Sequence, residues 1–186
     1  MSEDAVLETA VSAYQRTDPA DVSVNAICQM AGISKPSLYR AFGNEDGLTL
    51  AALDHYAQKV LSDLFAILQS NQSLRPTLDA LMDFAVDDMR METGCLFYKM
   101  RAGKHRLGPK TRARVDEIDR AAVEAFAAYL EEQKQAGAWD SDQTTPLVAR
   151  YLMEQIGLAL TQRATQESPA QIRAALALAL SVIKTT

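Results

Sequence analysis

The feature that most constrains this chain is the spacing of its apolar residues, which recur every three or four positions along nearly its whole length. The stretches 78–89 and 115–129 show it clearly, and each places its apolar side chains on one face of a helix. No segment alternates apolar and polar residues at the period of two that a half-buried strand requires. Most of the six prolines stand where a helix would begin, because a proline there loses no hydrogen bond. The sequence therefore predicts an all-α fold.

We predict about nine helices, and their lengths divide the chain. The first three are short and the others mostly long, which predicts a helix-turn-helix module over residues 1–47 and a larger helical body over residues 48–186. The nine ranges are 3–16, 24–31, 35–42, 45–70, 75–91, 94–104, 109–136, 145–165 and 168–184.

The composition excludes several classes of protein. With 48% hydrophobic and 23% charged residues, the chain has the balance of a soluble globular protein rather than a disordered one. Two cysteines form no disulfide framework, and the acidic N-terminus lacks the layout of a signal peptide. The most apolar stretch, residues 174–183, is shorter than a membrane span. We therefore expect a cytoplasmic protein with no membrane partner.

Catalytic and metal-binding patterns are absent from the sequence. His55 and His105 are the only histidines, and neither belongs to a metal-binding spacing. A stretch at residues 103–111 approaches a phosphate-binding loop, but no strand precedes it and Pro109 lacks the N–H that such a loop uses. We expect no metal, no cofactor and no enzymatic activity.

Residues 22–42 have the pattern of a helix-turn-helix. Ser23 is a good N-cap for the first helix, and Gly32 supplies the positive φ of a tight turn. Ser34 caps the next helix and Pro36 opens it. The second helix of this motif lies in the major groove of DNA. A buried helix pair in another kind of α protein is the alternative.

The outward side chains of that second helix suit DNA, since they combine cations, hydroxyls and an aromatic ring with a polar tip. We assign Ser23 to a phosphate, because free N–H groups at a helix start favour anions. The predicted DNA contacts are Ser23, Ser34, Lys35, Pro36, Ser37, Tyr39, Arg40 and Asn44.

Residues 31–48, AGISKPSLYRAFGNEDGL, resemble the N-terminal signature of TetR-family transcriptional regulators. The resemblance covers about the first 55 residues closely, and the remainder matches in length and layout. It implies a homodimer, usually a repressor, that binds a palindromic operator in double-stranded DNA and is released by a small-molecule effector. Two alternatives stay open. One is a helical binding protein or enzyme that has lost operator binding, and the other is a thiol-based sensor acting through Cys95.

The N-terminal module departs from the family in its charge. Many members carry Lys where this chain has Glu45, at a position that meets a phosphate. The first 47 residues hold seven acids against three cations. We therefore expect sharp operator recognition and weak binding to unrelated DNA.

The resemblance also implies a ligand cavity in the middle of the C-terminal bundle, where flexible Met side chains suit an adaptable pocket. The predicted ligand contacts are Met82, Met89, Phe97, Met100, Phe126, Tyr151 and Gln155.

The last predicted helix is apolar nearly all round, so we expect it to form a dimer interface with the helix before it. Burial inside its own chain is the alternative. The predicted interface residues are Leu152, Ile156, Leu160, Ala175, Leu178 and Ile183.

Residues 101–114 hold six cations and no acid. One interpretation is a solvated face tied by Arg112–Asp116 and Arg114–Glu117 pairs. The other is a contact with an anionic ligand, with DNA or with the N-terminal module.

Overall fold

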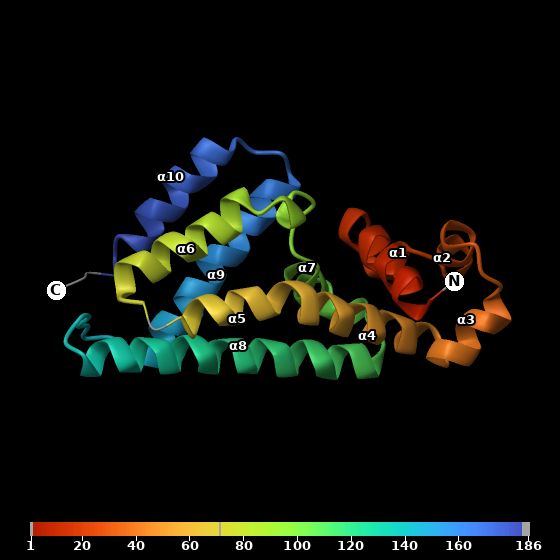
Figure 1. Ribbon diagram of the computed structural model, residues 1–186, viewed down its shortest axis with the longest axis horizontal. Coiled ribbons are helices and arrows are strands. Elements are labelled where there is room, and N and C mark those ends of the chain that lie inside the picture. Colours follow the sequence, from red (N-terminus) through yellow and green to blue (C-terminus); the bar gives the residue numbers. More distant parts are fainter. Residues whose placement is uncertain (1, 71, 184–186) are drawn as a thin grey trace. The chain divides into compact units, whose positions relative to one another are not determined.

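The computed structural model describes residues 2–70 and 72–183, and the described chain is helical with no strands (Figure 1). The predicted all-α fold is confirmed. The α-helices are α1 (Glu3–Arg16), α2 (Val24–Ala31), α3 (Lys35–Phe42), α4 (Glu45–Tyr56), α5 (Ser62–Leu68), α6 (Leu74–Asp87), α7 (Leu96–Ala102), α8 (Pro109–Gln135), α9 (Thr145–Ala164) and α10 (Pro169–Leu180).

Four shorter helical segments connect them. Three are 3₁₀ turns, η1 (Pro19–Asp21), η3 (Met89–Met91) and η4 (Lys104–Arg106). The fourth is a π-helical segment, η2 (Ala57–Leu61), which joins α4 to α5. The helix predicted over 45–70 is therefore interrupted by one wider turn rather than continuous α-helix.

Three other predicted helices end or begin differently. The helix predicted over 168–184 ends at Leu180, and residue 184 lies outside the described residues. The helix predicted over 75–91 stops at Asp87, because Asp88 leaves the helical conformation and its side chain caps the η3 turn. The helix predicted over 94–104 begins at Leu96, since Gly94 has a φ of +81° that an α-helix does not contain.

The contacts divide the chain into two compact units. Unit 1 comprises Met1–Leu61 and Cys95–Ile118, and unit 2 comprises Ser62–Gly94 and Asp119–Thr186. Unit 1 therefore contains the predicted N-terminal module together with α4, η2, α7, η4 and the start of α8. These units are defined by packing. The division of the chain into functional domains at residue 47 stays a prediction.

The core of unit 1 forms where α1 packs on α2 and α4 (Figure 1). Tyr14 on α1, Ile27 on α2 and Leu38 on α3 are each at most 1% exposed. The Tyr14 hydroxyl lies 3.4 Å from Thr49 Oγ1 on α4, so the buried ring keeps a hydrogen bond. This core fixes the position of α3 through side chains that point away from its exposed face.

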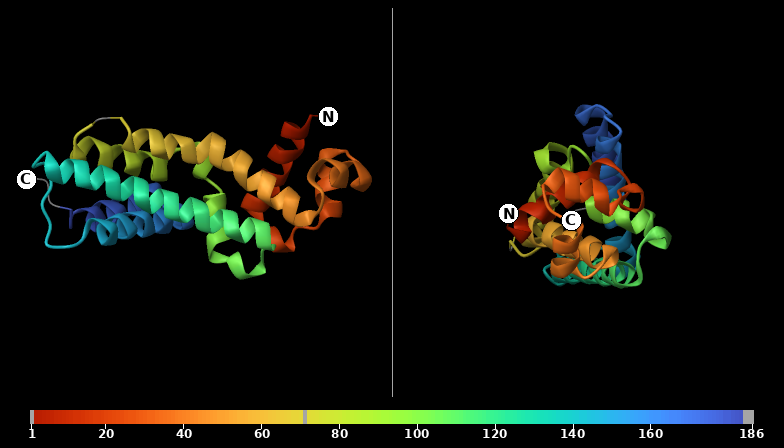
Figure 2. Two further views of the ribbon diagram at one scale, coloured as in Figure 1. Left: turned by 90° about the horizontal axis from the view of Figure 1, so that it is seen from below. Right: turned by 90° about the vertical axis from the view of Figure 1, so that its right-hand side faces the viewer.

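In unit 2, α6, α9 and α10 pack against one another (Figure 2). Leu81 on α6, Ile156 on α9 and Ile172 on α10 are at most 2% exposed. The Tyr151 hydroxyl on α9 donates to the Ala179 carbonyl on α10 at 2.9 Å, which ties these two helices together.

Candidate nucleic-acid interface

The turn between α2 and α3 has the geometry that the sequence predicts. Ser23 Oγ accepts a hydrogen bond from Ala26 N at 3.1 Å and caps α2. Gly32 has a φ of +63° and a ψ of +35°, the left-handed conformation that glycine adopts without strain. Ile33 N donates to the Cys28 carbonyl at 3.0 Å, which closes the end of α2. The two helices are thus joined by a tight, hydrogen-bonded turn.

Helix α3 is amphipathic, with one buried face and one exposed face, as a recognition helix must be. Leu38 is fully buried against the unit, whereas Lys35, Tyr39 and Arg40 are exposed. Ser34 caps the helix by accepting from Ser37 N at 3.3 Å, and Pro36 lies in its first turn. Of the residues predicted to contact DNA, Lys35, Tyr39 and Arg40 therefore lie on the exposed part of α3.

The polar side chains on this surface hold one another in place. Ser34 Oγ donates to Ser37 Oγ at 2.9 Å, and Arg40 Nη2 donates to the same Ser37 oxygen at 3.4 Å. Lys35 Nζ lies 5.6 Å from the centroid of the Tyr39 ring, a cation–π distance. Within the described residues, neither Lys35 nor Arg40 has an acidic side chain within 4 Å. Both charges therefore remain available to an anion.

The start of α4 is held close to the end of α3. Asn44 Oδ1 accepts a hydrogen bond from Gly47 N at 2.9 Å and caps α4. One polar atom of Asn44, a predicted DNA contact, is therefore already hydrogen-bonded within the chain. A Cβ atom on Gly47 would lie 2.0 Å from the Phe42 carbonyl oxygen. Only glycine allows this close approach, which fixes the angle between α3 and α4.

Asp46 joins α4 to the start of α8. Its carboxylate accepts hydrogen bonds from Lys110 N at 2.9 Å, from Thr111 N at 3.0 Å and from Thr111 Oγ1 at 2.6 Å. A Cβ on Gly108 would lie 2.3 Å from Asp46 Cγ, so glycine leaves the room this carboxylate needs. Burial raises the pKa of Asp46, but the hydrogen bonds from Thr111 and Lys110 outweigh it and the pKa is lowered. Asp46 therefore acts as an N-cap supplied by another helix.

Three acids of the N-terminal module, Glu8, Asp18 and Asp21, have cationic partners from outside it. Arg106 lies 3.1 Å from Asp18 and 2.5 Å from Asp21, and its hydrogen bond to Asp21 lowers the pKa of that carboxylate. Lys59 pairs with Glu8. Residues 95–118 hold seven cations against two acids, and they belong to the same unit. The acidic excess of the first 47 residues is therefore balanced within unit 1.

Of the two interpretations of the cationic stretch, the contact with the N-terminal module is present, through Arg106. The predicted Arg114–Glu117 pair also forms, at 3.0 Å, and Arg114 contacts Asp54 as well, at 2.6 Å. The predicted Arg112–Asp116 pair is wrong, because Asp116 pairs with Lys104 at 2.5 Å instead.

Residues 6–52, which include α2, α3 and the turn between them, match the family model described as "Bacterial regulatory proteins, tetR family". This segment is the N-terminal helix-turn-helix domain of TetR-family regulatory proteins. No curated protein matches the chain by sequence.

Solved TetR-family structures share the fold over nearly the whole chain. One is NemR of Escherichia coli in its reduced form, with 21% identity, a TM-score of 0.82 and coverage of 97% of this chain and 96% of that one. A regulator from Agrobacterium tumefaciens has 20% identity, a TM-score of 0.85 and the same coverage. A cysteine mutant of the regulator CifR, complexed with 26-bp double-strand operator DNA, has 20% identity, a TM-score of 0.82 and again the same coverage.

The ligand contacts predicted from the TetR-family resemblance do not line one described pocket. Phe97 and Met100 are buried in unit 1, whereas Phe126 is buried in unit 2. Met82 is the one predicted contact that lines a described pocket, a space of about 400 Å³ between α6 and α10. The placement of Met89 inside a cavity of the bundle is wrong, because the η3 turn leaves its side chain 81% exposed.

The residues predicted for the dimer interface fall into two groups. Leu152, Ile156 and Leu160 are at most 2% exposed, and Ile183 is 6% exposed, because their own unit already covers them. They therefore have little surface to offer a partner, and their assignment needs correction. Ala175 and Leu178 are exposed on α10, and the other large exposed apolar side chains of α9 and the C-terminal segment are Leu147, Leu158 and Val182.

The two cysteines are free and buried. Cys95 lies in unit 1, and burial raises the pKa of its thiol despite a hydrogen bond with Tyr56. In the part of the chain that the structure describes, no three His, Cys, Asp or Glu side chains are grouped to hold a metal ion. None of the described helices is both long and apolar enough to span a membrane.

Proposed function

We propose that this protein is a homodimeric TetR-family repressor that binds a palindromic operator through α3 and is released by a small-molecule effector. The observation that carries the proposal is the outward surface of α3, where Lys35 and Arg40 have no acidic partner among the described residues and Lys35 lies over the Tyr39 ring. A rigid helix with unpaired cations and short hydroxyls matches the phosphates and base edges of a major groove.

Each predicted contact has a role in this proposal. Lys35 binds a base edge or a nearby phosphate, and Tyr39 binds a phosphate or a thymine methyl group. Ser37 is a shorter contact that Arg40 steadies by its hydrogen bond. The remaining predicted contacts either stabilise the ends of the helices or bind phosphates. They are Ser23, Ser34, Pro36 and Asn44.

The dimer is proposed to form through the exposed faces of α9 and α10. Leu158, Leu178 and Val182 are 54%, 74% and 63% exposed, although each is large and apolar. Large apolar side chains that are exposed on two packed helices, and on the segment that follows α10, favour a protein partner. A two-fold pair of α3 helices would read half-sites about one helical turn, ~34–36 Å, apart.

Release by an effector is the part of the proposal that rests most on the family. A compound that prefers one state of the dimer shifts the equilibrium only by its difference in affinity for the two states. Such a compound should raise the melting temperature and lower operator affinity together. The alternative of a thiol sensor is less favoured, because a buried thiol with a raised pKa reacts slowly. We propose no catalytic role for any residue, and we place the protein in the cytoplasm with its DNA.

The test begins with a duplex that the wild-type protein selects from a random-sequence library. Lys35→Ala and Tyr39→Ala should each weaken binding to this duplex by roughly 1–3 kcal/mol per half-site. Lys134→Ala is a matched control, since Lys134 Nζ lies 5.9 Å from the Trp139 ring in a similar cation–π contact in unit 2. Its affinity should equal that of the wild type. If Lys35→Ala and Tyr39→Ala both bind the duplex like the wild type, α3 is not the recognition helix.

A further inference from the structure

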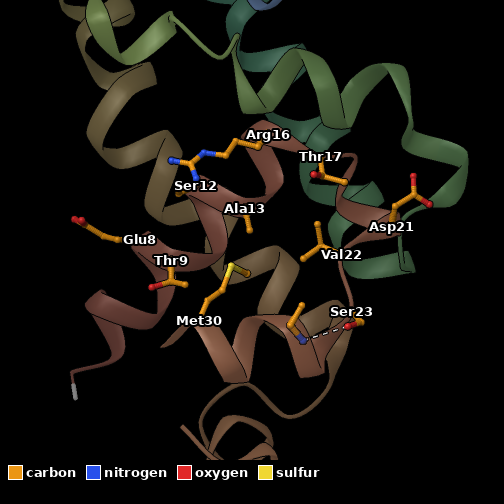
Figure 3. Close-up of a pocket in the computed structure, with 11 residues that line it drawn as sticks. Glu8, Thr9, Ser12, Ala13, Arg16, Thr17, Asp21, Val22, Ser23 and Met30 are labelled. Atoms are coloured by element: carbon orange, nitrogen blue, oxygen red, sulfur yellow. Dashed lines mark hydrogen bonds between the residues drawn. The ribbon is translucent and has the colours of Figure 1, made fainter. Parts of the chain in front are cut away.

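A groove of about 630 Å³ lies between α1 and α2, within unit 1, and it is open to solvent rather than enclosed (Figure 3). The proposed reading surface uses only one of its lining residues, Ser23. The α1 side contributes Glu8, Thr9, Ser12, Ala13, Arg16 and the following Thr17, and the α2 side contributes Asp21, Val22, Ser23, Ala26 and Met30.

The lining combines three kinds of surface. Its apolar part includes Ala13, Val22 and Met30, of which Met30 is 55% exposed. Four hydroxyl side chains and one guanidinium, that of Arg16, surround this apolar part (Figure 3). Arg16 is exposed, and no acidic side chain of the described residues lies within 4 Å of it. Hydroxyls and arginine are the side chains that most often contact DNA phosphates.

The two acids of the groove are already paired with cations outside it. Glu8 pairs with Lys59, and His55 Nε2 lies 3.8 Å from the same carboxylate. Asp21 pairs with Arg106, as described above. Both carboxylates therefore have their charge compensated, whereas the positive charge of Arg16 does not. The groove presents one uncompensated cation beside hydroxyls and apolar surface.

We propose that this groove receives the sugar–phosphate backbone of a DNA strand, with Arg16 on a phosphate, the hydroxyls on neighbouring oxygens and the apolar residues against deoxyribose. The proposal rests on the DNA binding proposed above and adds a second contact surface to it. Ser23 belongs to both surfaces, so a strand that meets the start of α2 also reaches the groove. An open groove suits a continuous strand, whereas small-molecule sites enclose most of their ligand.

A backbone contact has a signature that separates it from base reading. Arg16→Gln should weaken binding to the selected duplex and to a duplex of unrelated sequence by the same factor, about three- to tenfold at moderate salt. It should also lower the slope of log affinity against log salt by about one for each Arg16 that is bound. The matched control is Arg120→Gln, the same change at an exposed arginine of α8 in unit 2. Its affinity and slope should equal those of the wild type.

A gain of binding excludes unfolding as the cause. Thr9→Lys adds a cation to the groove wall and should tighten binding to both duplexes and steepen the salt dependence. If Arg16→Gln and Thr9→Lys bind like wild type while Tyr39→Ala loses affinity, the groove does not contact DNA and the inference fails, although the proposed function stands. A loss confined to the selected duplex also overturns it. A wild-type protein that selects no duplex overturns both.

Discussion

Replacing Asp46 with alanine removes the carboxylate that caps α8 from a different helix. Three hydrogen bonds of 2.6 to 3.0 Å are lost, and the Thr111 hydroxyl, in a residue that is 0% exposed, keeps only its 3.2 Å hydrogen bond to the Asp46 carbonyl oxygen. Loss of an N-cap costs about 0.5–2 kcal/mol, and the loss of one further hydrogen bond costs about 0.5–1.5 kcal/mol. Asp46 is only partly buried, so water replaces part of this loss.

We therefore expect Asp46→Ala to lower the free energy of unfolding by about 2 kcal/mol. For a chain of this length that corresponds to a fall in melting temperature of roughly 4–8 °C. Asp116→Ala is the matched control, because its exposed pair with Lys104 should contribute about 0.5 kcal/mol or less. Gly108→Ala should act in the same direction as Asp46→Ala, since its Cβ would displace the carboxylate.

The effect of Asp46 should depend on pH in a stated direction. The folded-state pKa of this carboxyl is lowered, so its contribution is fully present above the unfolded-state pKa of about 3.9. The contribution is lost as the pH falls through the folded-state value. The difference in melting temperature between wild type and Asp46→Ala, measured by calorimetry, should thus be constant near neutral pH and shrink below about pH 4. Equal melting temperatures at pH 7 would refute the capping role.

Three other predictions follow from burial and charge. Leu178→Glu should give a folded monomer by light scattering, and a dimeric Leu178→Glu protein would exclude this face of α10 as the dimer interface. Leu160→Glu should instead lower the melting temperature severely, because Leu160 is 1% exposed. Cys95 should resist alkylation at neutral pH until the protein is denatured, because burial raises the pKa of its thiol, and rapid labelling of the native protein would contradict this. Glu45→Lys should tighten binding to all duplexes and steepen its salt dependence in titrations at two salt concentrations, and an unchanged slope would place Glu45 away from DNA.

The first three helices were predictable to the residue because each is bounded by local signals. Ser23 and Ser34 cap their helices, and Gly32 ends α2 in the left-handed conformation that the sequence indicates. Such interactions join residues that are only three or four positions apart, so they can be predicted from the sequence. The outward surface of α3 follows from the same periodicity, although its contacts with DNA stay predictions.

Features that depend on packing could not be predicted in this way. The π-helical segment at Ala57–Leu61 has no local sequence signal, and it interrupts a run whose apolar spacing reads as one helix. The exposure of Met89 follows from a short turn that Asp88 caps, which apolar periodicity does not reveal. Apolar spacing also treats the two sides of α10 alike, although Ile172 and Leu176 face their own unit and Leu178 does not.

The charge of the N-terminal module shows why segments distant in sequence matter for DNA binding. From the first 47 residues alone, an excess of acids predicts weak binding to unrelated DNA. In the folded unit, Arg106 holds Asp18 and Asp21, and Asp46 is bound to the start of α8, so fewer of these acids are free to repel phosphates. Lys99 Nζ also donates to the Gln15 carbonyl at the end of α1. The electrostatics of the DNA-binding surface are therefore set in part by residues 99–111, which lie outside the segment that matches the family model.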